Sequence, residues 1–149
     1  MTKQCLWMLP LIWAISAASL AKEHEVRAVG VKFDPAIIFI EPGDTISWTN
    51  MPAHLVETID AMSPEEFEKI LSELGIDFSH TFNEEGIIVY KCTPHWGARM
   101  GGIIMVGKPD NIQETIDQYY EEIKTDRSLL PAKGLLKKFK KKLKAEGIE

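Results

Sequence analysis

The feature that most constrains this chain is the run KCTPHWGARMGG, residues 91–102, which lies between two segments expected to form strands. It brings a thiol, an imidazole and a thioether into one short loop, with the spacing C-x₂-H-x₄-M at Cys92, His95 and Met100. A second imidazole, His54, lies far upstream between two further expected strands. Thiolate, two imidazoles and a thioether form a soft donor set, which suits copper in a His₂Cys geometry with a long axial methionine bond. The sequence therefore predicts a fold that brings these four side chains together.

Other interpretations of the same residues remain open. Zinc is the main rival metal, although a thioether is a poor fourth ligand and structural zinc sites usually carry more thiolates. An iron–sulfur cluster lacks the cysteines that it needs. A nucleophilic Cys92–His95 pair is conceivable, but it leaves Met100 and the strand–loop–strand setting unexplained. A small buried cysteine without any ligand role is the last alternative.

The first 21 residues have the layout of a secretory signal peptide. Lys3 precedes an uncharged, mostly apolar stretch, and the small residues Ser19 and Ala21 occupy positions −3 and −1 of a cleavage site. The alternative is an uncleaved N-terminal anchor. Cleavage after Ala21 leaves a single cysteine, Cys92, which has no disulfide partner in an exported protein and needs another explanation.

Charge is unevenly distributed along the chain. The 149 residues favour one folded domain, and the net charge of −5 argues against a nucleic-acid binder, which usually shows a basic face. Residues 131–149 hold seven lysines and two glutamates, whereas residues 22–130 hold nine basic and twenty acidic residues. We expect the basic tail to lie against the acidic body, since opposite charges attract. The alternative is a tail that contacts an anionic membrane or partner.

Short segments with β-branched residues or alternating apolar residues, separated by turn residues, predict an antiparallel sandwich. A change of phase beside Gly30 indicates a bulge in the first strand. The expected strands are 25–33, 36–41, 44–50, 55–59, 77–82, 86–92 and 103–106.

Three helices are also expected. Ser63 to Glu66 forms a capping box with proline at the first helical position, and the apolar residues that follow at helical spacing predict a helix that ends at Gly75. Two apolar stripes at helical spacing predict C-terminal helices over 112–123, with Asp110 as the cap, and over 135–143. Their apolar faces should dock against the sandwich.

Three segments resemble the cupredoxins, the small blue copper proteins, and most of all their pseudoazurin subfamily: FDPAIIFIEPGDTISW (33–48), HLVETI (54–59) and VYKCTPHWGARMGGIIMVG (89–107). The resemblance implies an all-β Greek-key sandwich (cupredoxin-like) with one short inserted helix and two C-terminal helices. The expected division of the chain is a signal peptide at 1–21, a copper-binding domain at 22–109 and a helical extension at 110–149.

The resemblance implies that His54, Cys92 and His95 are equatorial ligands of one copper ion, with Met100 as the axial ligand, and that the ion cycles between Cu(I) and Cu(II). It implies a monomeric periplasmic electron carrier, not an enzyme, which exchanges one electron with redox enzymes or cytochromes. Nucleic acid is not an expected partner, nor is a membrane once the signal peptide is cleaved. The alternative is a periplasmic copper delivery or storage protein. Such proteins favour exposed Met- or His-rich tracts, which this chain lacks.

Two departures from the family pattern bear on the site. Leu55 follows the upstream histidine where these proteins commonly carry asparagine, which weakens the expected link to Thr93 and puts the rigidity of the site in doubt. Lysines commonly surround the docking patch in pseudoazurins, whereas only Lys91 and Arg99 lie near the ligand loop here. Partner choice could therefore differ.

The remaining expectations concern side chains around the site and two further histidines. An apolar docking patch around the edge of His95 is expected from Met51, Pro52, Pro94 and Trp96, with core packing as the alternative for Trp96. Glycines 97, 101 and 102 should permit close backbone approach or unusual φ. Of the other histidines, His24 is expected to be incidental and exposed, and His80 is expected to be an inward-facing structural residue.

Overall fold

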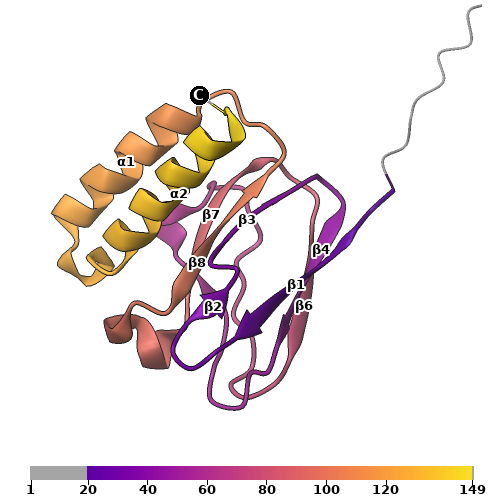
Figure 1. Cartoon of the computed structure of the whole chain (residues 1–149). Helices are drawn as coiled ribbons and strands as arrows, with labels where there is room; N and C mark the ends of the chain where they lie inside the picture. Colours follow the sequence, from indigo (N-terminus) through magenta and orange to yellow (C-terminus); the bar gives the residue numbers. More distant parts are fainter. Residues whose placement is uncertain (1–19, 149) are drawn as a thin grey trace, which may run out of the picture.

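The structure, a computed structural model, describes residues 20–148, which form two packed sheets with a pair of helices against one of them (Figure 1). One sheet contains β1 (Glu23–Ala28), β2 (Phe33–Asp34), β4 (Asp44–Thr49) and β6 (Phe78–Phe82). The other contains β3 (Ile37–Ile40), β5 (Glu57–Thr58), β7 (Gly86–Lys91) and β8 (Gly101–Val106). The helices are α1 (Ile112–Thr125) and α2 (Ala132–Glu146), and the 3₁₀ turns are η1 (Asp60–Met62), η2 (Thr93–Ala98) and η3 (Arg127–Leu129). Apart from its last two residues, the expected signal peptide lies outside the described residues.

Both sheets are mixed rather than purely antiparallel. The strand orders are β2-β1-β4-β6 and β3-β8-β7-β5, and the pairs β1–β4 and β3–β8 are parallel. The predicted all-β Greek-key sandwich with C-terminal helices is confirmed. The expectation of a purely antiparallel one is wrong, because strands distant in sequence become neighbours when the chain crosses between the sheets.

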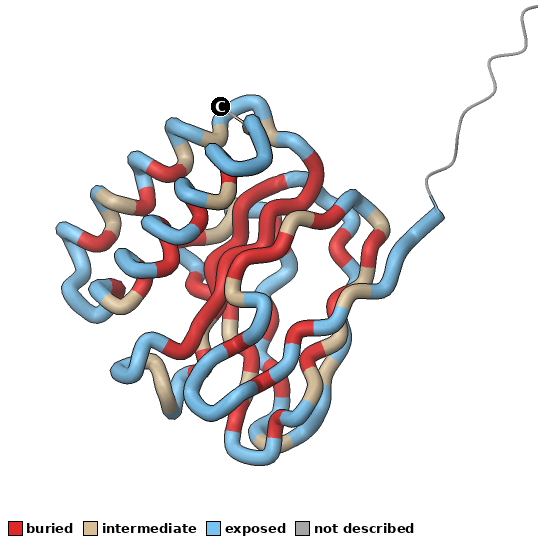
Figure 2. The backbone as a smooth tube through the Cα atoms, viewed as in Figure 1, coloured by how far each residue is buried: buried red, intermediate tan, exposed pale blue. Residues whose placement is uncertain are grey.

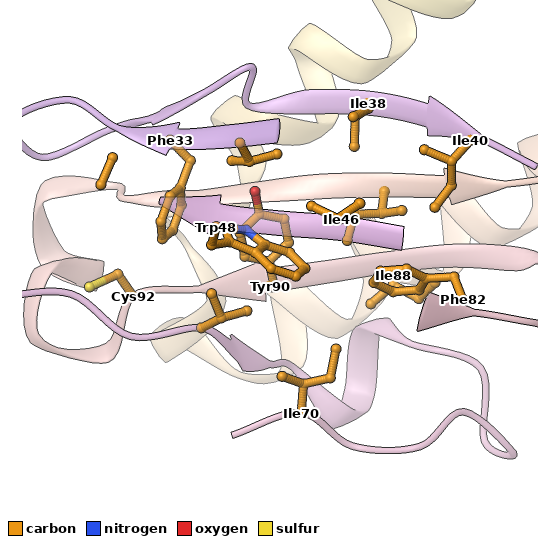
Figure 3. Packing of buried hydrophobic residues seen from close by; sticks show 14 of the residues in the cluster. Phe33, Ile38, Ile40, Ile46, Trp48, Ile70, Phe82, Ile88, Tyr90 and Cys92 are labelled. Atoms are coloured by element: carbon orange, nitrogen blue, oxygen red, sulfur yellow. The ribbon is translucent and has the colours of Figure 1, made fainter. Parts of the chain in front are cut away.

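Alternation along the strands builds the core between the sheets, called here the inner core. In β4 every second residue from Asp44 to Trp48 is buried, while the residues between them are partly exposed. Figure 3 shows Ile46 and Trp48 of β4 among side chains of the facing sheet, with Cys92 at one end of the cluster. The inner core consists of Val26, Ala28, Phe33, Ile38, Ile40, Ile46, Trp48, Met51, Val56, Phe67, Ile70, Phe82, Ile88, Tyr90, Cys92, Met100, Ile104 and Val106.

A second apolar cluster, the outer core, lies between the two helices and the sheet that contains β3, β8 and β7. Strand β8 is buried along its whole length because the helices cover its outer side (Figures 1 and 2). From the helices, the outer core receives Ile116, Tyr119 and Ile123 of α1, and Ala132, Leu135, Leu136, Phe139 and Leu143 of α2. The predicted docking of both apolar stripes is therefore observed.

The lysines of α2 take little part in this docking. Six of the seven are exposed, and the seventh, Lys142, lies with its Nζ 5.1 Å from the centre of the Phe39 ring. Of the four ion pairs found among residues 20–148, none involves a lysine of α2. The tail therefore packs on the body as expected, but apolar side chains rather than opposite charges make the contact.

The helix predicted from Ser63 to Gly75 is wrong. Residues 70–72 instead run beside β5: the Thr58 N–H donates to the Ile70 carbonyl (3.0 Å), and the Ser72 N–H donates to the Val56 carbonyl (2.9 Å). A helix would satisfy its own backbone groups and leave those of β5 unpaired on this side. The short inserted helix of the sandwich is η1, directly upstream.

Two local expectations are also corrected. Gly30 lies in a tight turn between β1 and β2, with hydrogen bonds of 2.9 and 3.2 Å between the backbones of Val29 and Lys32, rather than in a bulge. Asp110 does not cap α1, because the helix starts one residue later behind Asn111, whose side chain makes no capping hydrogen bond.

Within residues 20–148, no helix combines the length and the apolar character needed to cross a lipid bilayer.

Candidate metal centre

The four predicted donors belong to two loops at one end of the sandwich. Cys92 directly follows β7, His95 lies in η2, Met100 directly precedes β8, and His54 lies in the loop between β4 and β5. The pairing of β7 with β8 closes the longer loop, since the Cys92 N–H donates to the Met100 carbonyl (2.9 Å). The His95 N–H donates to the Cys92 carbonyl (2.9 Å), so the backbone fixes the spacing of all three donors in this loop.

Three of the donors converge. The Cys92 Sγ lies 3.7 Å from the Nδ1 of His54 and 3.4 Å from the Nδ1 of His95. The three candidate ligand atoms of these residues all lie within 4.8 Å of one another, and the two imidazole centres are 4.9 Å apart. Among residues 20–148 this is the one cluster of at least three His, Cys, Asp or Glu side chains with metal-binding spacing. The sequence prediction therefore holds for the geometry of this trio.

These distances fit a single soft metal ion. Bonds of about 2.0–2.3 Å at angles near 120° put neighbouring donor atoms about 3.5–4 Å apart, which matches the two sulfur–nitrogen distances. One thiolate, two imidazole nitrogens and a buried methionine on the same loop are the donor types of a His₂Cys copper site with a weak axial ligand. Met100 is 0% exposed, and its N–H donates to the carbonyl of His95 (3.2 Å).

Burial is graded across the site. Cys92 is fully buried at the end of the inner core, His54 is 9% exposed, and His95 is only partly buried. Burial lowers the pKa of His54, and the nearby charge of protonated His95 lowers it further. Both effects favour the neutral imidazole, which is the form that binds a metal.

Glycines make the loop compact beside the sheet. A Cβ on Gly101 would lie 2.5 Å from the Tyr90 carbonyl oxygen, and a Cβ on Gly102 would lie 2.5 Å from the Tyr90 Cζ. The expected close approach is thus found at these two glycines. The residue of this loop with a left-handed backbone conformation is Arg99 (φ +66°), not one of its glycines. Its N–H donates to the Trp96 carbonyl at the end of η2.

A brace between the two ligand loops was not predicted from the sequence. Thr93, the residue after Cys92, donates its hydroxyl hydrogen bond to the carboxylate of Glu57. Glu57 lies three residues after His54, and its other carboxylate oxygen is 3.4 Å from the Lys91 Nζ. The side chain of Glu57 therefore links the strand that follows His54 to both neighbours of Cys92. It provides a link to Thr93 that the apolar Leu55 cannot make. The register of β5 against β7, which pairs Glu57 with Lys91, makes this contact possible.

The predicted docking patch is only partly present. Pro52 and Pro94 are exposed beside the site, whereas Met51 is 1% exposed and belongs to the inner core. Trp96 packs against the outer core, and its indole N–H donates to the Ser128 carbonyl (2.9 Å), so it ties the ligand loop to η3. Core packing, the alternative weighed for Trp96, describes it better.

The two remaining histidines lie elsewhere. His80 packs among aromatic rings, stacked on Phe78 and edge-on to Phe67 and Phe82, in agreement with the prediction of a structural residue. The prediction for His24 is wrong: its Nε2 lies 2.8 Å from Asp44, a buried carboxylate, so the residue is not incidental.

Comparison with known proteins agrees with this geometry. The sequence model of the copper binding proteins of the plastocyanin/azurin family matches residues 21–107. The chain is 35% identical to pseudoazurin of Paracoccus pantotrophus over 107 residues, which cover 66% of this chain and 74% of that protein. It is 35% identical to pseudoazurin of Methylorubrum extorquens over 83 residues, which cover 54% of this chain and 56% of that protein.

A solved structure shows the same architecture. The crystal structure of pseudoazurin from Methylobacterium extorquens AM1 superposes with a TM-score of 0.59 at 29% sequence identity, covering 63% of this chain and 83% of that one. The match of the family's sequence model runs from just before β1 to just past the end of β8, and so includes all four donors. On this combination of sequence match, fold and donor geometry, the chain belongs to the plastocyanin/azurin family of copper-binding cupredoxins.

Proposed function

We propose that this protein carries one electron at a time on a single type I copper ion in the periplasm, between redox enzymes or cytochromes. Membership of the family makes it a blue copper electron carrier rather than an enzyme. The proposal adds the ligand set: His54, Cys92 and His95 would hold the copper ion, with Met100 as a weaker fourth ligand. The convergence of the two Nδ1 atoms on the Cys92 Sγ supports it most directly.

Bound copper supplies the one-electron chemistry by alternating between Cu(II) and Cu(I), and the chain supplies a fixed environment. Cys92 binds as thiolate, since a coordinating thiol is deprotonated. Pro94 has no N–H to donate to that sulfur, and hydrogen bonds to a metal-bound sulfur tune its potential. Water is excluded on the protein side because Cys92 and Met100 are fully buried. Electrons would pass at the partly exposed His95, beside Pro94.

The location is part of the same proposal. Residues 1–21 act as a signal peptide, 22–109 form the copper-binding domain, and 110–149 form a helical extension. The layout of the leader supports export. The extension shares the outer core with the sheet that carries Cys92 and Met100, so we expect it to hold the ligand loop through Trp96 and Ser128.

The visible spectrum of the Cu(II)-loaded protein tests the proposal. We expect intense absorption near roughly 600 nm from the copper–thiolate bond, together with reversible voltammetry in the absence of any substrate. Cys92→Ser and His95→Gln should abolish this band. His80→Gln is the matched control, because it removes an imidazole that lies among aromatic rings away from the site. A pale protein that loses copper rapidly would indicate delivery or storage instead, and a blue Cys92→Ser variant would refute the ligand set.

A further inference from the structure

The backbone nitrogen of Lys22 donates a hydrogen bond to the Asp44 Oδ1 at 2.7 Å. We propose that the chain is cut between Ala21 and Lys22, and that the new α-ammonium group of Lys22 forms an ion pair with Asp44 that stabilises the mature protein. The inference rests on the proposed export, which already sets the cut after Ala21, and deepens it by giving the new terminus a structural role.

Asp44 is a buried carboxylate that faces no permanently charged group among residues 20–148. It is 2% exposed, and besides Lys22 it accepts hydrogen bonds from the Nε2 of His24 (2.8 Å) and the N–H of Glu41 (3.1 Å). Burial alone would raise the pKa of Asp44, but these hydrogen bonds, with that of His24 foremost, lower it to about 2. Among residues 20–148, its one ion-pair partner is His24, a side chain that is charged only when protonated.

The position of Lys22 is fixed by the sheet. The Thr45 N–H donates to the Lys22 carbonyl (2.9 Å), and the next residue, Glu23, already pairs with Thr45 in the parallel ladder of β1 and β4. Residues 20 and 21 are exposed and belong to neither core, so the segment before Lys22 is not held by apolar packing. Because consecutive Cα atoms lie about 3.8 Å apart, a cut one residue earlier or later would place the ammonium away from Asp44.

The cleavage step is a peptide hydrolysis. An endopeptidase of the export machinery that accepts small residues at −3 and −1, here Ser19 and Ala21, adds one water molecule across the bond. Ala21 leaves with the released peptide as a carboxylate, and Lys22 gains an amine that is protonated at neutral pH. The amide donor at Asp44 is thereby replaced by an ammonium donor at the same position.

This replacement should stabilise the fold. Hydrogen bonds in which both groups are charged are shorter and stronger than those with one neutral partner. Lys22 is exposed whereas Asp44 is buried, so the gain should exceed that of a surface ion pair only modestly. We expect the unfolding equilibrium constant at pH 7 to fall by about five- to tenfold.

Three forms of the mature chain test the ion pair by urea unfolding: one that starts at Lys22, one that starts at Ala21, and one that starts at Lys22 with an acetylated α-amine. The first should unfold at a higher urea concentration than the other two. In an Asp44→Asn background the three should unfold together. Equal stability of the first two forms with Asp44 present, or a difference that persists with Asn, would overturn the ion pair. The acetylated form decides the question even if Asp44→Asn does not fold.

The cut itself is tested on the full chain exported from a bacterial host. Its intact mass should equal that of residues 22–149, and any other N-terminus would overturn the assigned position. The spectrum of the copper-loaded forms keeps this inference separate from the proposed function. Both unacetylated forms should be equally blue, since Asp44 and the ligand loops lie at opposite ends of β4. Colourless forms that still differ in stability would refute the copper assignment and support the ion pair.

Discussion

The two ends of the sandwich each place histidine beside a buried acidic group, two at the Cys92 end and one at the Asp44 end, yet they differ in what completes the cluster. At one end the Cys92 Sγ faces two imidazole nitrogens, at 3.4 and 3.7 Å. At the other end, where the N-terminal segment enters (Figure 1), Asp44 accepts three hydrogen bonds, two of them from backbone N–H groups.

The comparison shows what distinguishes a metal site from a structural cluster in the same fold. The oxygens of Asp44 already accept three hydrogen bonds from N–H groups, so N–H donors rather than a metal ion satisfy this carboxylate. At the Cys92 end the lone pairs of three side chains point to a common centre, which is favourable only when a cation occupies it or when protons are shared. We therefore expect copper to change the stability of the protein through the Cys92 end, and acid to change it through the Asp44 end.

The largest expected effect is that of copper on stability. Copper that binds the folded state more tightly than the unfolded state should add about 4 kcal/mol to the free energy of unfolding when free copper is a thousandfold above Kd. Urea unfolding with and without Cu(II) measures this gain. Cys92→Ser should abolish it, whereas His24→Gln, which removes the histidine at the other end, should retain it. A gain that survives Cys92→Ser or is lost in His24→Gln would break the comparison.

The next largest expected effect is the loss of stability when a glycine at each end of the sandwich is replaced by alanine. Gly102→Ala should cost about 3 kcal/mol, because its Cβ would meet the ring of Tyr90, which is 1% exposed and has no room to move. Gly43→Ala, in the turn before β4, should cost only about 1 kcal/mol. Its Cβ meets nothing within 4 Å, and the cost comes from its positive φ of +95°. Urea unfolding of the two copper-free variants checks the ratio, and equal losses would contradict it.

The acid response should follow Asp44. Its folded pKa is about 2, below the ordinary value of 3.8, so its ionised form stabilises the folded state. This contribution, about 2 kcal/mol, is fully present above about pH 5 and is lost progressively as the pH falls from about 5 to about 1. Asp44→Asn should lower the stability at pH 6 and flatten its decline below pH 4. Stability measured from pH 2 to pH 6 tests this, and a variant that declines as steeply as the wild type would contradict it.

The copper end was predictable from sequence because three donors lie in one loop and their chemistry is unusual. The strand periodicity predicted the sheets for a similar reason, since alternation is local. The helix from Ser63 to Gly75 failed because Phe67 and Ile70 are at helical spacing, but β5 needs the backbone of residues 70–72 as its neighbour. The spacing of apolar residues within one segment does not show that a distant strand pairs with its backbone.

The contacts that were missed join residues far apart in the sequence. Nothing local indicates that His24 and Asp44, or Glu57 and Thr93, are partners. Each pair depends on strand register: β1 against β4 in the first case and β5 against β7 in the second. Register follows from the packing of whole sheets, so a single sequence supplies the residues of such contacts without their pairing.

The smallest expected effect concerns the brace at the copper end. Glu57→Ala removes the acceptor of the Thr93 hydroxyl and should weaken copper binding about tenfold, or about 1.4 kcal/mol, because outer contacts orient the ligands. Glu57→Gln keeps an oxygen acceptor and should restore most of that affinity, although it loses the charge that faces Lys91. Competition with a copper chelator measures both, and voltammetry should show a shifted potential for the alanine variant alone. If the glutamine variant is as weak as the alanine variant, the ion pair with Lys91 rather than the bond to Thr93 aligns the ligand loops, and Lys91→Gln should then reproduce the loss.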